Sequence, residues 1–299
     1  MVSVIMSVYK EDEEWLQEAI ESILKQTYND LEFIITLDNP DNFKLKEILI
    51  KYSKNDSRIK LIFNNTNKGL VYCLNNMLKS SKGEYIARMD ADDIAFPSRI
   101  EKQLIYMKEN DIDLLGSNTI NFNETIEYTN KLFLLDKDIK TNIGNGAYIP
   151  HPTWLVRRKV YEDLNGYRDI NSAEDYDFIL RTIKKGYKIG NYSKPLLKYR
   201  INNNSISRKN ALKQKLTSIY LFENFDRIDE VEKDEINNII IKVNNKQEEK
   251  YSKGEKLFYC YKQQKNKVIK FYILLKLLFR YSIYLKYNKF RNIKESLKK

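Results

Sequence analysis

The amino-acid sequence predicts an α/β protein with a largely parallel sheet, followed by a helical C-terminal region. Over the first 200 residues, short β-branched and aromatic runs alternate with helical patterns, which is typical of βαβ units. After Arg208 the strand signals end. With 299 residues and 42% apolar content, the chain suits a domain of about 200 to 250 residues with an appendage, or two ordinary domains. Disordered and fibrous proteins are thereby excluded.

Apolar periodicity and turn signals place the individual elements. Strands are expected at residues 2–8, 31–37, 59–63 and 84–89. Helices are expected at residues 14–26, 43–52, 70–78, 97–110, 159–164 and 174–185. Asp12 is the expected N-cap of the first helix, and Gly83, Gly166 and Gly186 are expected to end three others. This order brings the loops after the strands to one edge of the sheet, where open α/β sheets bind ligands.

The basic charge of the chain is concentrated near its C-terminus. Residues 250–299 contain 15 Lys and Arg against 2 Asp and Glu, whereas residues 1–249 contain 37 against 39. We therefore expect a near-neutral α/β domain over residues 1–207 and a basic helical extension over residues 208–299. Helices of the extension are expected near residues 209–225, 229–245, 250–265 and 268–290.

The last of these helices mixes apolar and aromatic side chains with Lys and Arg. Such a helix can lie in the interface of an anionic membrane, where each basic residue contributes about 1 kcal/mol. Alternatively, it packs on the α/β domain or on a second copy of the chain, with its lysines in water. RNA binding is a third reading, but no RNA-binding motif supports it, and we expect no nucleic-acid partner. No run of about 18 uncharged apolar residues indicates a membrane span.

Cysteine usage and the N-terminal sequence indicate a cytoplasmic protein. Cys73 and Cys260 are far apart and form no C-x-x-C motif, so neither a disulfide scaffold nor a structural zinc site is expected. The first residues have no basic leader or apolar run before a cleavage site, so no signal peptide is expected.

Asp90, Asp92 and Asp93 follow the strand at 84–89 and form a concentrated negative site. Mn²⁺ and Mg²⁺ prefer carboxylate oxygens while keeping water and phosphate ligands. One carboxylate would then hold the metal and another a ribose hydroxyl. The alternative is a solvated acidic turn, because Asp is favoured in turns. Asp38 ends the second strand at the same edge. There it either accepts a hydrogen bond from a nucleotide base or ribose, or it simply forms a turn.

No G-x-G-x-x-G or G-x-x-x-x-G-K-S/T motif follows any strand, which argues against nicotinamide dehydrogenases and P-loop enzymes. Glu174 and Asp175 lie at a predicted helix start. Asp175 is either part of a capping box with Ser172 or a general base kept ionised by the helix N-terminus.

His151, the only histidine, lies between two prolines. It is either a metal contact or a satisfied buried histidine. Arg200 follows a strand, and it either neutralises a phosphate or belongs to a surface loop.

Together these motifs resemble the family 2 inverting glycosyltransferases of bacterial surface-polysaccharide type, which have the GT-A fold. A D-x-D pair alone is a weak signal, but the ordered series over about two thirds of the chain is highly specific. The matching stretches are residues 2–9, 19–28, 67–69, 74–75, 82–93, 97–99, 151–152, 166–167, 174–177 and 199–200.

The resemblance implies a nucleotide-sugar donor, most often a UDP-sugar, and a Mn²⁺ or Mg²⁺ ion held by Asp92. Asp38 would lie near the base and Asp90 near the ribose. Asp175, with Glu174 beside it, would deprotonate an acceptor hydroxyl for a single displacement with inversion. The further donor contacts that it implies are Val8, Tyr9, Glu11, Asn67, Lys68, Arg88, Ala91 and Arg200.

Two departures from the family pattern concern the base contacts. Ser7 stands where many relatives have Pro, and a single Asp38 replaces the usual acidic pair. The Q-x-x-R-W signature of processive relatives is absent after Asp175, which favours addition of one sugar per encounter. The tail and the habit of the family favour a lipid-diphosphate-linked glycan acceptor at the cytoplasmic face of the membrane. The alternatives are a sugar nucleotidyltransferase and a non-catalytic nucleotide-sugar or nucleic-acid binding module.

Overall fold

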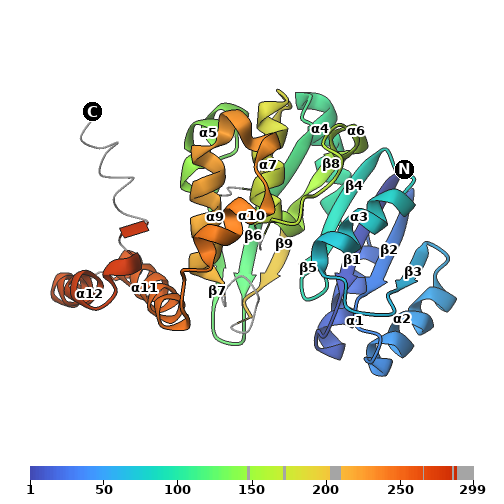
Figure 1. Ribbon diagram of the computed structural model, residues 1–299. Helices are drawn as coiled ribbons and strands as arrows, with labels where there is room; N and C mark the ends of the chain where they lie inside the picture. Colours follow the sequence, from blue (N-terminus) through green and yellow to red (C-terminus); the bar gives the residue numbers. More distant parts are fainter. Residues whose placement is uncertain (147–148, 171–172, 203–209, 265, 285, 288–299) are drawn as a thin grey trace. The chain divides into compact units, whose positions relative to one another are not determined.

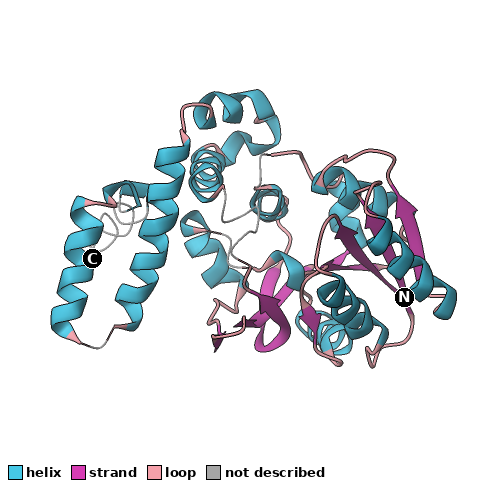
Figure 2. Cartoon of the chain, turned by 90° about the horizontal axis from the view of Figure 1, so that it is seen from below, coloured by secondary structure: helices cyan, strands magenta, loops and turns pink. Residues whose placement is uncertain are grey.

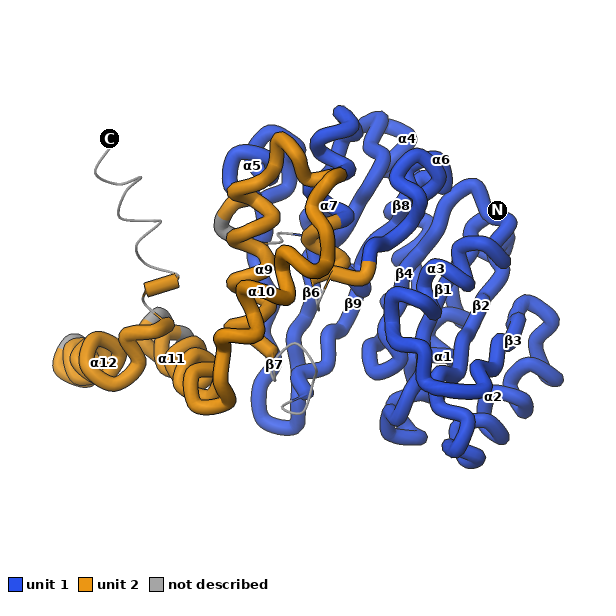
Figure 3. The backbone as a smooth tube through the Cα atoms, in the orientation of Figure 1, with its two compact units in different colours: residues 1–143, 147–168, 178–202 blue, residues 144–146, 169–177, 203–299 orange. Residues whose placement is uncertain are grey.

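The computed structural model describes residues 1–146, 149–170, 173–202, 210–264, 266–284 and 286–287. The chain divides into two compact units, which Figure 3 distinguishes by colour. Unit 1 comprises residues 1–143, 147–168 and 178–202, and unit 2 comprises residues 144–146, 169–177 and 203–299. The expected domain boundary at 207/208 lies outside the described residues and stays a prediction.

Unit 1 is built on a nine-stranded sheet (Figure 1) with the order β3-β2-β1-β4-β8-β6-β9-β5, and β7 pairs with β6. β1, β2, β3, β4, β6 and β9 run in one direction, because β8 is antiparallel to both β4 and β6, and β9 is parallel to β6. The predicted, largely parallel sheet is therefore present. The strands are β1 (Val2–Val8), β2 (Leu31–Leu37), β3 (Ile59–Phe63), β4 (Tyr85–Asp90), β5 (Ile94–Ala95), β6 (Leu114–Phe122), β7 (Glu127–Thr129), β8 (Leu155–Arg157) and β9 (Ile189–Arg200).

Helices cover both faces of the parallel strands, which explains why β1 and β2 are buried almost throughout. Right-handed crossovers put α1 and α2, which contact each other, on one face and α3 on the other. Asp12 caps α1 as predicted, because its carboxylate accepts from the backbone N–H of Glu14 at 2.9 Å. The helices are α1 (Glu13–Leu24), α2 (Phe43–Asn55), α3 (Leu70–Ser80), α4 (Arg99–Asn110), α5 (Asp136–Asn142), α6 (Arg158–Asp163) and α7 (Glu174–Lys184), with short η1 (Ile143–Asn145) and η2 (His151–Thr153).

A polar network closes the amino-terminal edge of the parallel strands. Ser3 Oγ donates to Glu32 Oε1 at 2.5 Å and accepts from the backbone N–H of Gly83 at 2.7 Å. Glu32 also accepts from the backbone N–H of Lys82 and pairs with Lys60 at 2.5 Å. These partners compensate the burial of the Glu32 carboxylate. They also bring Gly83 so close to β1 that a Cβ there would lie 2.4 Å from the Ser3 nitrogen.

Beyond residue 210, the described part of unit 2 contains only helices and loops (Figure 2). Its helices are α9 (Ala211–Glu223), η3 (Phe225–Glu230), α10 (Lys233–Ile240), α11 (Asn245–Gln263) and α12 (Lys267–Phe279). α11 and α12 contact each other around a small buried cluster of Leu212, Tyr251, Ile273, Leu277 and Tyr284. Among the described residues, no helix has the length and apolar character needed to cross a membrane.

Several expected boundaries need correction. α3 ends at Ser80 and not at Gly83, whose role is the close approach to Ser3. Gly166 and Gly186 have φ of 72° and 83°, which confirms them as helix-ending residues. Of the helix expected at 229–245, the structure has α10, which a capping box at Glu232 starts, and the last residues of η3. The helix expected at 268–290 is interrupted after Phe279: residues 282–284 and 286–287 are again helical, and residues 288–290 lie outside the described residues.

Replacing Gly83 by Ala is expected to lower the free energy of unfolding by about 1–3 kcal/mol, because the new Cβ would overlap the Ser3 backbone. Urea denaturation followed by circular dichroism measures the loss. Lys82→Ala is the matched control, since its side chain is exposed and its bond to Glu32 uses the backbone N–H. Equal stability of Gly83→Ala and wild type would contradict the close approach.

Candidate functional site

The carboxyl ends of several strands meet at one edge of the sheet in unit 1. β1 ends at Val8 and pairs in parallel with β2, which ends just before Asp38, and with β4, which ends at Asp90. β9 runs in the same direction and ends at Arg200. Val8 and Ala91 are buried at this edge. The residues predicted from β1, β2, β4 and β9 therefore lie along a single edge.

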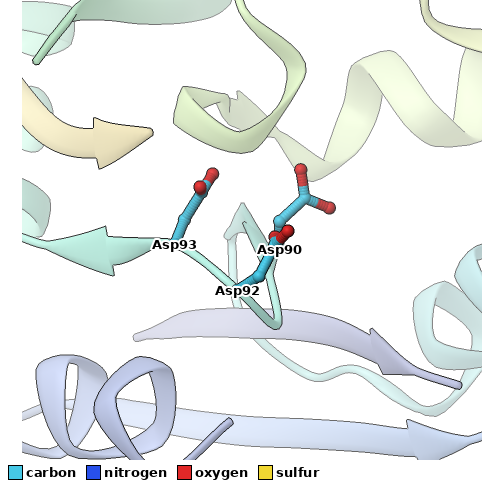
Figure 4. Close-up of side chains that lie close together, drawn as sticks. All are labelled: Asp90, Asp92 and Asp93. Atoms are coloured by element: carbon cyan, nitrogen blue, oxygen red, sulfur yellow. The ribbon is translucent and has the colours of Figure 1, made fainter. Parts of the chain in front are cut away.

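Asp90, Asp92 and Asp93 come from one turn after β4, and Figure 4 shows their side chains together. One carboxylate oxygen of each lies within 4.8 Å of the other two. Asp90 and Asp92 are half-buried, whereas Asp93 is fully buried. Oδ2 of Asp93 has no hydrogen-bond partner among the described residues. A buried carboxylate oxygen without a partner is unfavourable, so this cluster suits a cation.

Burial and mutual repulsion raise the pKa values of the carboxyl groups in this cluster, which favours their protonated forms. Burial, and then the charges of Asp90 and Glu11, raise the pKa of Asp92 to about 7. The pKa of Asp93 is also well above its usual value, because of burial and then Asp90. Burial likewise raises the pKa of Glu11, although its carboxylate accepts from the backbone N–H of Tyr9 at 2.7 Å. A cation that replaced these protons would relieve the repulsion.

Arg88 places a buried positive charge beside Asp90. Nη2 of Arg88 lies 2.5 Å from Oδ1 of Asp90. Burial opposes the charge of the guanidinium, but the neighbouring Asp90 outweighs it, so the pKa of Arg88 is raised. Nε and Nη1 of Arg88 have no hydrogen-bond partner within the described ranges. Arg88 is thus the charge partner of Asp90, and its contact with a donor stays a prediction.

Arg99, the first residue of α4, is a second buried cation next to the cluster. Its Nη2 donates to the carbonyl oxygens of Arg88 at 2.7 Å and Trp154 at 3.4 Å, and its Nε donates to Gln103 at 3.1 Å. Burial lowers the pKa of Arg99 to about 9, against the opposing effect of Asp93. Arg99 therefore ties the end of β4 to the segment before β8.

Arg200 binds the acidic turn from β9. Its backbone N–H donates to Oδ1 of Asp93, and its Nε donates to the carbonyl oxygen of Asp92, both at 2.8 Å. Its Nη2 pairs with the carboxylate of Glu18 on α1. The structure thus brings Arg200 to the predicted metal site through bonds within the protein.

Asp38 is buried after β2 and holds the loop at residues 64–69. Its Oδ1 accepts from the side-chain amide of Asn64 at 2.7 Å and from the backbone N–H of Lys68 at 2.8 Å. Its Oδ2 accepts from the backbone N–H of Gly69 at 2.8 Å, which also donates to Asn67 Oδ1. Asp38, the predicted base contact, is therefore brought together with Asn67 and Lys68, which were predicted as further donor contacts.

His151 lies in a buried aromatic cluster. Its Nε2 is 2.8 Å from the hydroxyl of Tyr167, which is 3.0 Å from the hydroxyl of Tyr161. Its ring centre lies 4.5 Å from that of Trp154. Burial lowers the pKa of His151 well below its usual value, so the ring is neutral. This geometry agrees with a satisfied buried histidine. Its role as a metal contact stays a prediction.

The predicted catalytic acids, Glu174 and Asp175, stand in the first turn of α7 and belong to unit 2. Oδ1 of Asp175 accepts from the backbone N–H of Tyr176 at 2.7 Å. Asp177 in the same turn is fully buried. The helix dipole favours ionised acids at this position. Ser172, the expected cap, lies outside the described residues, so both interpretations of Asp175 stay predictions.

Sequence reasoning included Asp93 in the acidic site without giving it a role of its own, and it assigned no role to Arg99. The signal for Asp93 is its position directly after the D-x-D pair. Arg99 carries a weaker signal: a basic residue in the first turn of a helix opposes the helix dipole, which suggests a specific partner. Glu18 has no local signal, because its partner Arg200 is 182 residues away.

A mainly parallel sheet with an acidic turn at its carboxyl edge agrees with the GT-A fold. Residues 3–164 match the family described as "Glycosyl transferase family 2", and the chain belongs to this family. This membership supports a glycosyltransferase enzyme and lends no support to the alternatives of a sugar nucleotidyltransferase and a non-catalytic module.

A relative agrees with this membership, and two solved structures agree with the fold. The O-antigen biosynthesis glycosyltransferase WbnJ of Escherichia coli is 35% identical over 215 residues, which cover 71% of this chain and 84% of WbnJ. S. aureus TarS 1-349 in complex with UDP-GlcNAc has a TM-score of 0.59 at 18% identity, covering 86% of this chain and 80% of TarS 1-349. The mannosyltransferase PcManGT from Pyrobaculum calidifontis, in complex with GDP-Man and Mn²⁺, has a TM-score of 0.61 at 14% identity, covering 96% and 83%.

Removing the Asp92 carboxylate is expected to change the pH dependence of stability when divalent metal is absent. The pKa is about 7 in the folded protein and 3.8 in a free side chain, so folding takes up a proton between these values. The resulting stabilisation is complete below about pH 4 and is lost as the pH rises through 7. Asp92→Asn should therefore be more stable than wild type at pH 8, by on the order of 1–3 kcal/mol, and this difference should shrink toward pH 5.

Urea denaturation in EDTA at pH 5 and pH 8 measures this difference. Glu109→Gln, which removes an exposed carboxylate on α4, is the control and should follow wild type at both pH values. A difference between Asp92→Asn and wild type that is the same at both pH values would contradict the raised pKa.

Proposed function

We propose that this glycosyltransferase moves one sugar from a nucleotide-sugar donor to a hydroxyl of a growing glycan, with inversion at the transferred carbon. The observation that carries the proposal is the cluster of Asp90, Asp92 and Asp93 at the carboxyl edge of the sheet. In the reaction, the acceptor oxygen bonds to the sugar carbon while the bond from that carbon to the phosphate oxygen breaks. The electron pair leaves with the nucleoside diphosphate, so negative charge develops at the site.

The residues of the cluster fit a divalent cation. Mn²⁺ and Mg²⁺ prefer carboxylate oxygens, and the partnerless Oδ2 of buried Asp93 is such an oxygen. Asp92 would hold the ion, with Asp90 and Asp93 beside it. When bound, the ion would supply positive charge against the leaving diphosphate. The complex of the mannosyltransferase PcManGT with GDP-Man and Mn²⁺ supports a metal site in this fold.

Asp175 is proposed as the general base, with Glu174 beside it. Both stand in the first turn of α7, where a helix N-terminus favours the ionised carboxylate. An ionised carboxylate can accept the proton of the acceptor hydroxyl as that oxygen bonds to the sugar carbon. The missing Q-x-x-R-W signature supports addition of a single sugar.

The donor is proposed to be a UDP-sugar and the acceptor a lipid-diphosphate-linked glycan of a surface polysaccharide. TarS 1-349 in complex with UDP-GlcNAc supports the nucleotide. Asp38, with Asn67 and Lys68 beside it, would lie near the base, and Asp90 near the ribose. The name of WbnJ, an O-antigen biosynthesis glycosyltransferase, supports the polysaccharide.

An exposed apolar surface on α12 is proposed to bind the inner, cytoplasmic face of the cell membrane. Ile273 and Leu277 of α12 are buried, whereas six other large apolar side chains of this helix are 46–84% exposed. Lys270, Lys276 and Arg280 lie among them in the sequence. An anionic leaflet would cover the apolar side chains and attract the basic ones. The exposed apolar side chains are Val268, Ile269, Phe271, Tyr272, Leu278 and Phe279.

Asp92→Ala and Asp175→Asn are both expected to abolish transfer, but for different reasons. The first removes a metal contact, so it should also weaken metal-dependent donor binding. The second removes the proton acceptor and should leave donor binding unchanged. Release of nucleoside diphosphate from a panel of nucleotide sugars, with Mn²⁺, Mg²⁺ or EDTA, measures turnover, and calorimetry measures donor binding.

Glu109→Ala on α4 serves as the control for both variants and should turn over normally. Near-normal transfer by Asp175→Asn would show that another residue is the base. Metal-independent turnover that survives in Asp92→Ala would contradict the metal site.

Replacing Phe271 and Phe279 by Asp is expected to reduce binding to liposomes that contain anionic lipid, because charge would enter the apolar surface of α12. Cosedimentation with anionic and with neutral liposomes measures the loss. Ile241→Asp is the matched control, since Ile241 is 81% exposed but lies outside α12. Liposome binding that is unchanged in the double variant would reject the membrane surface. A loss of dimer in light scattering would assign the surface to a second copy of the chain instead.

A further inference from the structure

We propose that Arg200 is a positioning residue that fixes the acidic turn for metal binding, and that it is not a ligand of the donor diphosphate. This inference rests on the proposed function and concerns the same site. It replaces the expectation from sequence that Arg200 neutralises a phosphate. It follows from where the strands place Arg200 and from what its side chain contacts.

The first argument is that Arg200 reaches two of the three aspartates from another strand. Its backbone N–H donates to Oδ1 of Asp93, and its Nε donates to the carbonyl oxygen of Asp92, both at 2.8 Å. The first bond comes from the backbone, which Arg200→Ala and Arg200→Lys keep, and it orients the Asp93 carboxylate, whose Oδ2 has no partner among the described residues. The second bond fixes the backbone that carries the Asp92 carboxylate. Groups that orient metal ligands in this way strongly affect metal affinity.

The second argument is that the guanidinium of Arg200 is already held by other groups. Its central carbon lies 4.8 Å from the ring centre of Trp15 and 4.6 Å from that of Phe122. Its Nη2 pairs with Glu18, and its side chain is only 13% exposed. A diphosphate would have to compete with the Glu18 carboxylate and with two aromatic contacts. These contacts favour a positioning role for Arg200 over a role in binding the diphosphate.

The two roles predict different results for a lysine at this position. Lysine keeps the positive charge that would neutralise a phosphate, but it lacks the planar fork that bonds to Asp92 and Glu18 while packing on two rings. Arg200→Lys should therefore behave like Arg200→Ala if Arg200 is a positioning residue. It should behave nearly like wild type if Arg200 only supplies charge to the donor.

Glu18 provides a second test, because it contacts Arg200 without belonging to the acidic cluster. If Arg200 is a positioning residue, Glu18→Gln should weaken metal binding in the same direction as the Arg200 variants, to a smaller extent. If Arg200 binds the donor, Glu18→Gln should free its guanidinium and leave metal binding unchanged.

The experiment is calorimetric titration of the full-length protein with MnCl₂ alone and with UDP, combined with thermal unfolding. Arg200→Ala and Arg200→Lys are both expected to weaken Mn²⁺ binding by about 10–100-fold. Arg58→Ala is the matched control, since Arg58 also joins a carboxylate, that of Asp56, to a backbone carbonyl, that of Leu24. It should lower the melting temperature and leave Mn²⁺ binding unchanged.

Unchanged Mn²⁺ binding in Arg200→Lys and Glu18→Gln, with weaker UDP binding in Arg200→Ala, would overturn the positioning role. Failure of the wild type to bind Mn²⁺ would instead contradict the proposed metal site itself. Should Arg200→Ala fail to fold, the Lys and Glu18 variants still decide between the two roles.

Discussion

Three carboxylates crowded at the end of β4 impose the constraint on which the rest of unit 1 depends. Buried negative charges are unfavourable unless cations or hydrogen-bond donors lie beside them. Arg88 supplies a cation to Asp90, and Arg200 supplies a backbone donor to Asp93. Arg99 adds a second buried cation from α4. The cluster is therefore a product of several elements and not of the acidic turn alone.

The partners that the acidic cluster needs come from distant parts of the chain. The strands from β8 onward supply one of them. β5 follows Asp93 directly and pairs with β9, whose last residue is Arg200. The acidic turn is thus held between β4 on one side and β5 with β9 on the other. β8 and β6 fill the space between β4 and β9 in the strand order. The parallel half of the sheet carries the aspartates, and the half from β8 onward supplies Arg200.

The sequence predicted those parts of the structure that depend on residues close together along the chain. β1 and β2 are buried on both faces, so their continuous apolar runs are easy to recognise. β6 was not placed, and of β9 only a strand before Arg200 was expected, because Ser117 and Asn118 lie at irregularities in the pairing of these strands and Pro195 lies within β9. The acidic cluster was predicted because its members are adjacent, whereas the contacts of Arg99 and Glu18 depend on tertiary structure. The role of Asp175 stays a prediction.

The hydrogen bonds of Asp38 have an entropic consequence for recognition. Its two oxygens accept from Asn64, Lys68 and Gly69, so the loop at residues 64–69 is folded before any nucleotide arrives. The conformational entropy of this loop is then lost when the protein folds, so its ordering does not weaken nucleotide binding. In the proposed donor site, a base would meet a loop that these bonds already hold. Discrimination among bases would then depend on how well each base fits that loop.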